Sequence, residues 1–174
     1  MIITPGSLLS HFAVLPIVLP LLAGAALLLL GRRSERMAGI VGAVMIVAML
    51  GIAATLLGVT SSGAVIAYQV GNWAAPWGIT LMVDRLAALM LGITAVVALA
   101  SQLAAVARNN PLTSRFPALL QFQLVGLNGA FLTGDLFNLF VFFEVLLVAS
   151  YAMLLDGAWR TRLRAGLHYV TINL

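Results

Sequence analysis

The chain contains no cysteine and no lysine, and few charged residues of any kind. The absence of cysteine excludes a disulfide framework, a thiolate metal site and a thiol nucleophile. Only 8% of the residues are charged, whereas 63% are hydrophobic and the mean hydropathy is +1.12. A typical soluble domain has about 25% charged residues. A chain of this composition cannot cover itself with polar groups in water, so we predict an integral membrane protein.

Long apolar runs set the expected fold. As helices, five of them approach or exceed the length needed to cross a hydrocarbon core of roughly 30 Å. We therefore predict an all-α, polytopic bundle of about five complete transmembrane helices, followed by the start of a sixth. The predicted helices span residues 8–30, 37–59, 82–106, 116–132 and 136–155, and the truncated sixth spans 165–174.

The segment between the second and third predicted helices differs in character from the runs around it. Ala64–Val70 has the composition of a short strand with turn signals on both sides. Trp73 and Trp77 suit an aromatic belt at the membrane surface.

The arginines predict the orientation. All nine basic residues are Arg, and the successive loops carry three, none, two, none and three of them, with Arg85 at a helix end left aside. Because cytoplasmic loops are enriched in basic residues, the N-terminus is expected outside. Short clusters between apolar segments are not the pattern of a surface that follows nucleic-acid phosphates, so no nucleic-acid partner is expected.

Glu144 is the ionisable residue whose surroundings in the sequence are the most apolar. It lies well inside the apolar run 136–155, about 12 Å of helix rise from its start. An ionisable residue at the centre of a bilayer costs roughly 2.5–3.5 kcal/mol on insertion-based scales. Glu144 is therefore the candidate for binding and translocating a proton.

Other polar residues are candidates for supporting roles. Gln121 and Asn128 are seven residues apart and share a stripe, which fits either hydrogen bonding between helices or the organisation of water beside Glu144. Tyr151 lies on the predicted face of Glu144, and His168 lies near the inner end of the sixth helix.

Three charged residues lie at helix starts. Asp135 faces away from Glu144 and suits the N-terminal cap of the fifth helix. Asp84 and Arg85 are adjacent, which fits either a local neutralising pair or a role at the outer mouth of an ion path.

No phosphate-cradling loop, metal-ligand spacing or nucleophile constellation is visible. We predict no cofactor and no metal, and we favour a transporter subunit over an enzyme.

Two stretches resemble a known family. Residues 133–152, TGDLFNLFVFFEVLLVASYA, closely resemble the D subunit of Mrp-type (Mnh, Pha) multisubunit cation/proton antiporters. Residues 77–91, WGITLMVDRLAALML, resemble the third helix of the same subunit and its approach. The match covers most of the chain from about Gly71 onward and is specific. The wider group includes the antiporter-like proton-pumping subunits of respiratory complex I and of membrane-bound hydrogenases.

The resemblance implies a function and a site. Glu144 occupies the position of the family's essential fifth-helix glutamate, which pairs with a lysine on a later helix. This chain has no lysine and stops inside the sixth helix, so it resembles the N-terminal third or so (residues 1–174) of one antiporter-like transmembrane domain. The implied protein exchanges H⁺ for a monovalent cation, with Na⁺ favoured. It is expected to span a prokaryotic plasma membrane several times, in contact with lipid and with the other subunits of its complex.

Two other functions stay open at this point. One is a proton-pumping subunit of a redox complex related to NADH:quinone oxidoreductase or to hydrogenases. The other is a scaffold fragment that binds partner subunits and transports nothing.

Overall fold

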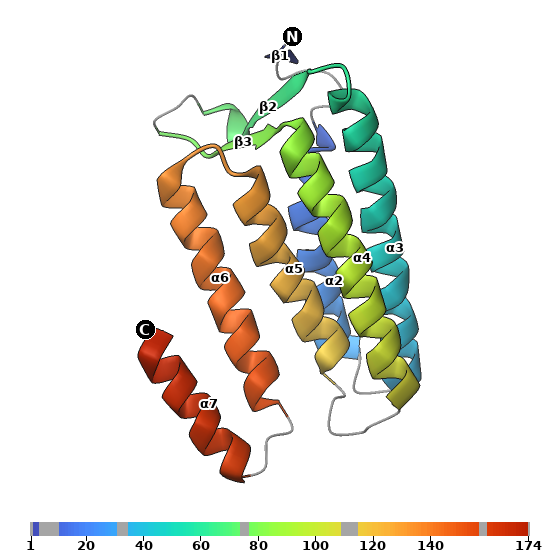
Figure 1. The fold of residues 1–174 in the computed structure, drawn as a ribbon, viewed down its shortest axis with the longest axis vertical. Helices are drawn as coiled ribbons and strands as arrows, with labels where there is room; N and C mark the ends of the chain where they lie inside the picture. Colours follow the sequence, from blue (N-terminus) through green and yellow to red (C-terminus); the bar gives the residue numbers. More distant parts are fainter. Residues whose placement is uncertain are drawn as a thin grey trace.

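The fold is described from a computed structural model of the chain, over residues 2–3, 11–30, 35–73, 77–108, 115–156 and 160–173. Most of these residues are helical (Figure 1). The helices are α2 (Leu15–Leu30), α3 (Glu35–Thr60), α4 (Arg85–Arg108), α5 (Phe116–Leu132), α6 (Leu136–Leu155) and α7 (Arg160–Asn173). The strands are β1 (Ile2–Ile3), β2 (Val65–Gln69) and β3 (Thr80–Val83), and a 3-10 turn, η1 (Val70–Asn72), follows β2.

The helices α2 to α6 run roughly alongside one another, and the small sheet covers one end of them (Figure 1). Helix α3 packs mainly on α4, and α5 packs on both α2 and α6. Helix α7 lies beside the half of α6 that is farther from the sheet (Figure 1). Glu144 on α6 is therefore near the edge of the bundle, not at its centre.

The observed helix ends agree with the sequence in some places and correct it in others. Helices α5 and α6 have the predicted bounds, 116–132 and 136–155. Helix α4 begins at Arg85 and not at residue 82, because 80–83 form β3 and pair with β2. An apolar run such as Thr80–Val83 has no helical period to separate a strand from a helix start. The predicted first helix, 8–30, is interrupted by a turn at 12–14, and α2 begins at Leu15; residues 8–10 lie outside the described part of the chain. Helix α7 begins at Arg160 and not at the predicted 165.

Three helices of the described chain are long and apolar enough to cross a membrane: Arg36–Thr60, Arg85–Ala107 and Leu136–Leu155. Helices α2 and α5 are apolar but shorter, at 16 and 17 residues. At 1.5 Å per residue these two rise about 24–26 Å, which is close to the thickness of a hydrocarbon core.

The sheet fastens segments that are distant in the sequence. Strand β1 pairs in parallel with β2, which pairs antiparallel with β3, and this confirms the strand expected at 64–70. An isolated bridge joins Leu81 to Thr133, and the Gly134 amide donates to the Thr80 carbonyl at 2.8 Å. The α5–α6 turn is thus attached to the sheet.

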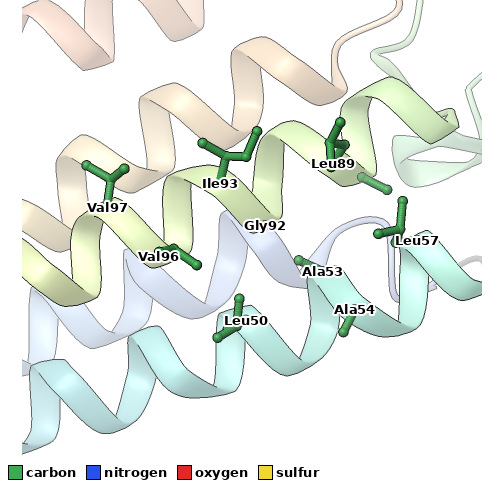
Figure 2. A pocket seen from close by; sticks show the side chains of 10 residues that line it. Leu50, Ala53, Ala54, Leu57, Leu89, Gly92, Ile93, Val96 and Val97 are labelled. Carbon is green, nitrogen blue, oxygen red and sulfur yellow. The ribbon is translucent and has the colours of Figure 1, made fainter.

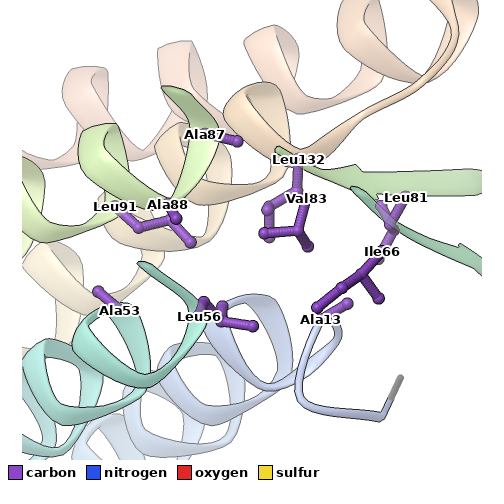
Figure 3. Close-up of a cluster of buried hydrophobic side chains, with 10 residues drawn as sticks. All are labelled: Ala13, Ala53, Leu56, Ile66, Leu81, Val83, Ala87, Ala88, Leu91 and Leu132. Carbon is purple, nitrogen blue, oxygen red and sulfur yellow. The ribbon is translucent and has the colours of Figure 1, made fainter. Parts of the chain in front are cut away.

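Beneath the sheet, a cluster of buried apolar side chains joins it to the helices (Figure 3). Ile66 and Val83 from the strands meet Leu56 of α3, Leu91 of α4 and Leu132 of α5, and none of the five is more than 3% exposed. The sheet is therefore part of the core at this end of the molecule.

Glycines allow α5 and α6 to approach closely. A β-carbon on Gly126 would lie 2.7 Å from the backbone N and Cα atoms of Leu146, and one on Gly129 would overlap the ring of Phe142. Small residues at helix interfaces in membranes permit this kind of backbone contact. The contact fixes which side of α6 faces α5.

A proline in α2 explains a buried hydrogen bond from α5. Pro20 lies inside the helix and has no N–H, so the carbonyl of Pro16 lacks its normal helical donor. The Asn128 side chain donates to that oxygen at 2.8 Å, and both residues are buried. The amide predicted to need a partner therefore satisfies a backbone group that the proline leaves free.

This pairing predicts a specific coupling between two positions. Asn128→Leu should destabilise the protein by about 1–3 kcal/mol, because it leaves the buried Pro16 carbonyl without a donor. In a Pro20→Ala background, the restored Ala N–H can bond to that carbonyl, so Asn128→Leu should cost much less. Denaturation of the four proteins in detergent measures the coupling. An equal effect of Asn128→Leu in both backgrounds would contradict this account.

Apart from Arg85, which begins α4 beside the sheet, the arginines near the described helix ends lie at one end of the bundle. The start of α3 (with Arg36), the end of α4 (Arg108) and the starts of α5 (after Arg115) and α7 (Arg160) all lie opposite the sheet (Figure 1). This distribution agrees with the predicted orientation, in which the sheet and the N-terminus are outside.

Candidate proton site on α6

Glu144 points away from the rest of the bundle. Phe142 and Leu146, the residues two positions before and after it, are the ones that face α5. At about 100° per residue, a helix position two residues away points to nearly the opposite side. Glu144 is accordingly exposed on the chain, in the middle of α6. The described residues therefore leave the outer side of its carboxyl open.

The surface around Glu144 is apolar and aromatic. Phe137, Phe140, Val141 and Val148 lie at helical spacings from it and are 79%, 64%, 41% and 63% exposed. A lone carboxylate amid such side chains is unfavourable against lipid tails. The arrangement therefore favours a protein or water neighbour at this point on α6.

Helix α7 covers the half of this face farther from the sheet. A β-carbon on Gly166 would lie 2.8 Å from the Leu155 side chain, so the two helices approach closely there. The rings of Tyr151 and Tyr169 meet edge to face, with centroids 5.8 Å apart and planes at 79°. Tyr151, a predicted supporting residue, is seven residues from Glu144 on the same face of α6. It therefore lies between Glu144 and the C-terminal end of that helix.

The predicted amide stripe on α5 faces the interior of the bundle. Gln121 Nε2 donates to the Gly42 carbonyl of α3 at 3.1 Å, and Asn128 donates to α2 as described above. Neither side chain bonds to Glu144. Of the two roles left open for this stripe, the structure shows hydrogen bonding between helices. The described part of α5 faces α6 with Gly126 and Gly129, and not with this stripe.

The acids at helix starts are caps. Asp135 Oδ1 accepts from the Asn138 amide at 2.6 Å, which confirms the predicted N-terminal cap of α6. Asn138 Nδ2 donates to Thr133 Oγ1 at 2.9 Å, so the side chains also brace the turn. Asp84 Oδ1 accepts from the Ala87 amide at 2.7 Å. Within the described chain no ion pair joins Asp84 to Arg85, so the expected local pair is replaced by a bond to the helix backbone.

His168 is exposed on α7. Its neighbour Tyr169 points toward α6, so His168 is turned about 100° away from that helix. The structure does not bring His168 together with Glu144.

A separate groove lies between α3 and α4 (Figure 2). Its volume is about 360 Å³, and only apolar residues line it, among them Ala53, Leu57, Gly92 and Val96. It offers no side-chain ligand or proton acceptor for an ion, so it is not the site of the chemistry expected here.

Sequence reasoning missed three residues around these sites. Gln102 is fully buried and donates to the Gly39 carbonyl at 3.0 Å. Asn138 is 2% exposed within the α5–α6 turn, and Tyr169 orients Tyr151. Gln102 could have been found from the sequence, because it is the one amide side chain in a largely apolar helix. No sequence pattern shows the other two contacts, because they depend on the path of the turn and on the packing of α7.

The fold and the apolar spans define a class, a multi-pass α-helical membrane protein with one acid in mid-helix. The chain is 46% identical over 171 residues to the D subunit of a probable K(+)/H(+) antiporter from Rhizobium meliloti (strain 1021). It is 36% identical over 169 residues to the D subunit of the Na(+)/H(+) antiporter from Alkalihalophilus pseudofirmus. Each match takes in 95% of this chain and 32% or 34% of the relative.

Solved structures give the same result. The Mrp complex from Dietzia sp. DQ12-45-1b contains a chain that matches with a TM-score of 0.82 and 31% identity, over 97% of this chain and 32% of that one. An archaeal respiratory complex, the membrane-bound sulfane sulfur reductase, contains one with a TM-score of 0.80 and 27% identity, over 91% of this chain and 33% of that one. No family model matches.

The chain is therefore a homologue of the antiporter D subunits, and it spans about a third of the length of the relatives it matches. The predicted resemblance to these proteins and the predicted membrane helix bundle are confirmed.

Proposed function

We propose that this chain forms part of the D subunit of a multisubunit antiporter that exchanges protons for a monovalent cation, with Glu144 as the proton-binding group. The observation that carries the proposal is the position of Glu144. It is the one acid in the interior of an apolar helix among the described residues, and its side chain is exposed on the part of the α6 face that α7 does not cover.

Chemistry supports a proton role for this group. An apolar setting favours the protonated, uncharged form of a carboxyl group, whereas a nearby cation favours the ionised form. Movement of a positive charge toward or away from Glu144 would therefore release or recapture a proton. The chain contains no lysine, so we propose that this charge comes from another part of the assembly.

The arrangement fits an assembly with further subunits in a prokaryotic plasma membrane. The exposed aromatic face of α6 suits protein contacts around the acid, and the relatives bear names of antiporter subunits. Those names divide between K⁺ and Na⁺, so the exchanged cation needs a direct measurement.

A second candidate function has one observation in its favour. The match to the archaeal respiratory complex fits a subunit that moves protons with redox energy. The two candidates differ in their energy source, since an antiporter responds to a cation gradient alone.

Everted vesicles containing the complete assembly with this subunit provide the test. Addition of Na⁺ or K⁺ to vesicles with an established pH gradient should release protons, as measured by a pH-sensitive dye. Proton movement that follows only the addition of an electron donor would favour the redox candidate. The absence of both responses, in an intact and fully assembled complex, would favour the scaffold.

A further inference from the structure

Four of the five buried side-chain oxygens that lack a hydrogen-bond partner in the described chain lie in the halves of their helices farther from the sheet. They are Gln102 Oε1, Gln121 Oε1, Gln123 Oε1 and the Tyr151 hydroxyl. Each helix has one end that is farther from the sheet, and each of these residues is four to seven positions from that end. This separation corresponds to about 6–11 Å along the helix axis. Unpartnered polar atoms are therefore concentrated in the half of the bundle farther from the sheet.

Gln102 and Gln121 stand out among these residues because both are fully buried and both lie beside Gly42 of α3. Gln102 comes from α4, and its Nε2 atom lies 3.0 Å from the position of a β-carbon on Gly42. Gln121 comes from α5, and its Nε2 atom donates to the Gly42 carbonyl at 3.1 Å. Two amide groups from different helices thus lie against the same stretch of α3, where the missing side chain of Gly42 leaves room for Gln102.

In both Gln102 and Gln121, the amide nitrogen is hydrogen-bonded but the amide oxygen is not. Each Nε2 atom donates to a carbonyl of α3, Gly39 for Gln102 and Gly42 for Gln121. Each Oε1 atom is enclosed and receives no hydrogen bond from the described residues. Buried amide oxygens in proteins are nearly always paired, and ordered water is the usual partner where the protein supplies none.

We propose that the Gly42 region of α3 is an internal water-binding site, in which water donates hydrogen bonds to Gln102 Oε1 and Gln121 Oε1. We assign a hydrogen-bond donor as the ligand, because both free atoms are acceptors. We take it to be small and neutral, because the three atoms nearest to a β-carbon on Gly42 belong to Gln102 and Pro117 and not to a charged side chain. Water satisfies these requirements with two hydrogens directed to two oxygens.

High-resolution cryo-EM of the complete assembly tests this site in the unaltered protein. Density for water within hydrogen-bonding distance of both Oε1 atoms is the expected result. Water at only one of the two oxygens, at neither, or a protein donor in its place would overturn the proposal. This outcome does not depend on Glu144 or on transport activity.

A double-mutant cycle gives an independent measurement. If water joins the two amides, Gln102→Leu and Gln121→Leu should be non-additive, and the second substitution should lower the unfolding temperature by less than it does alone. The matched control pairs Gln102→Leu with Asn128→Leu, which removes another buried α5 amide about 10 Å farther along the helix. That control pair should be additive. Additivity of the Gln102 and Gln121 pair as well would count against a shared water.

Discussion

Replacement of Glu144 by glutamine is expected to abolish proton-coupled cation exchange in the assembled complex. Glutamine keeps the shape and polarity of the side chain but cannot bind and release a proton. Loss of a positioned acid–base group typically lowers a rate by about 10²–10⁴-fold, which is below detection in most vesicle assays. Glu144→Asp retains a carboxyl group that is one methylene shorter, so it should keep partial activity.

The control for this substitution is Asp156→Asn. It removes one carboxylate from the same helix, but at its C-terminal cap and not in the apolar interior. Cation-dependent proton release should remain near the wild-type level in Asp156→Asn vesicles that contain equal amounts of assembled complex. Substantial exchange by the Glu144→Gln complex would exclude Glu144 as the proton-binding group, whatever the cation.

Gly126→Ala is expected to weaken the packing of α6 on α5. The added methyl group would lie 2.7 Å from backbone atoms of Leu146, which cannot move aside as the end of a flexible side chain can. Overpacking of this kind costs about 1–3 kcal/mol, more than the roughly 0.5–1 kcal/mol that alanine gains over glycine within a helix. A lower thermal unfolding temperature in detergent would report the loss, and the larger Gly126→Leu should release α6 from the bundle.

Gly51→Ala is the matched control on α3. No atom lies within 4 Å of the position that its β-carbon would occupy. The same substitution should therefore stabilise the protein by roughly 0.5–1 kcal/mol through the helical preference of alanine alone. Equal shifts in unfolding temperature for the two variants would show that the contact between Gly126 and Leu146 is not a determinant of stability.

The sequence was sufficient for the features that depend on local patterns. The bounds of α5 and α6 were predictable because turn residues and polar caps such as Asp135 flank continuous apolar runs. The strand at β2 was also predictable, from its composition and the turns beside it. The acid at Glu144 was conspicuous because nothing else in its helix interior is charged.

Features that depend on packing were not predictable in the same way. The side of α5 that faces α6 is decided by Gly126 and Gly129, and a glycine in a sequence does not reveal which neighbour approaches it. Gln121 and Asn128 were recognisable as polar residues that need partners, but those partners are backbone carbonyls more than 75 residues away. The second half of strand β3, Met82 and Val83, was assigned to a helix because a short apolar run suits either structure.

The bond between Asn128 and the carbonyl left free by Pro20 also bears on how the two positions can change during evolution. Loss of the asparagine is harmful while the proline remains, but it becomes tolerable once residue 20 again carries an N–H. The proline can therefore be lost first, whereas loss of the asparagine first passes through a destabilised intermediate. Among homologous sequences, a non-donor at position 128 should therefore occur chiefly where position 20 is no longer proline.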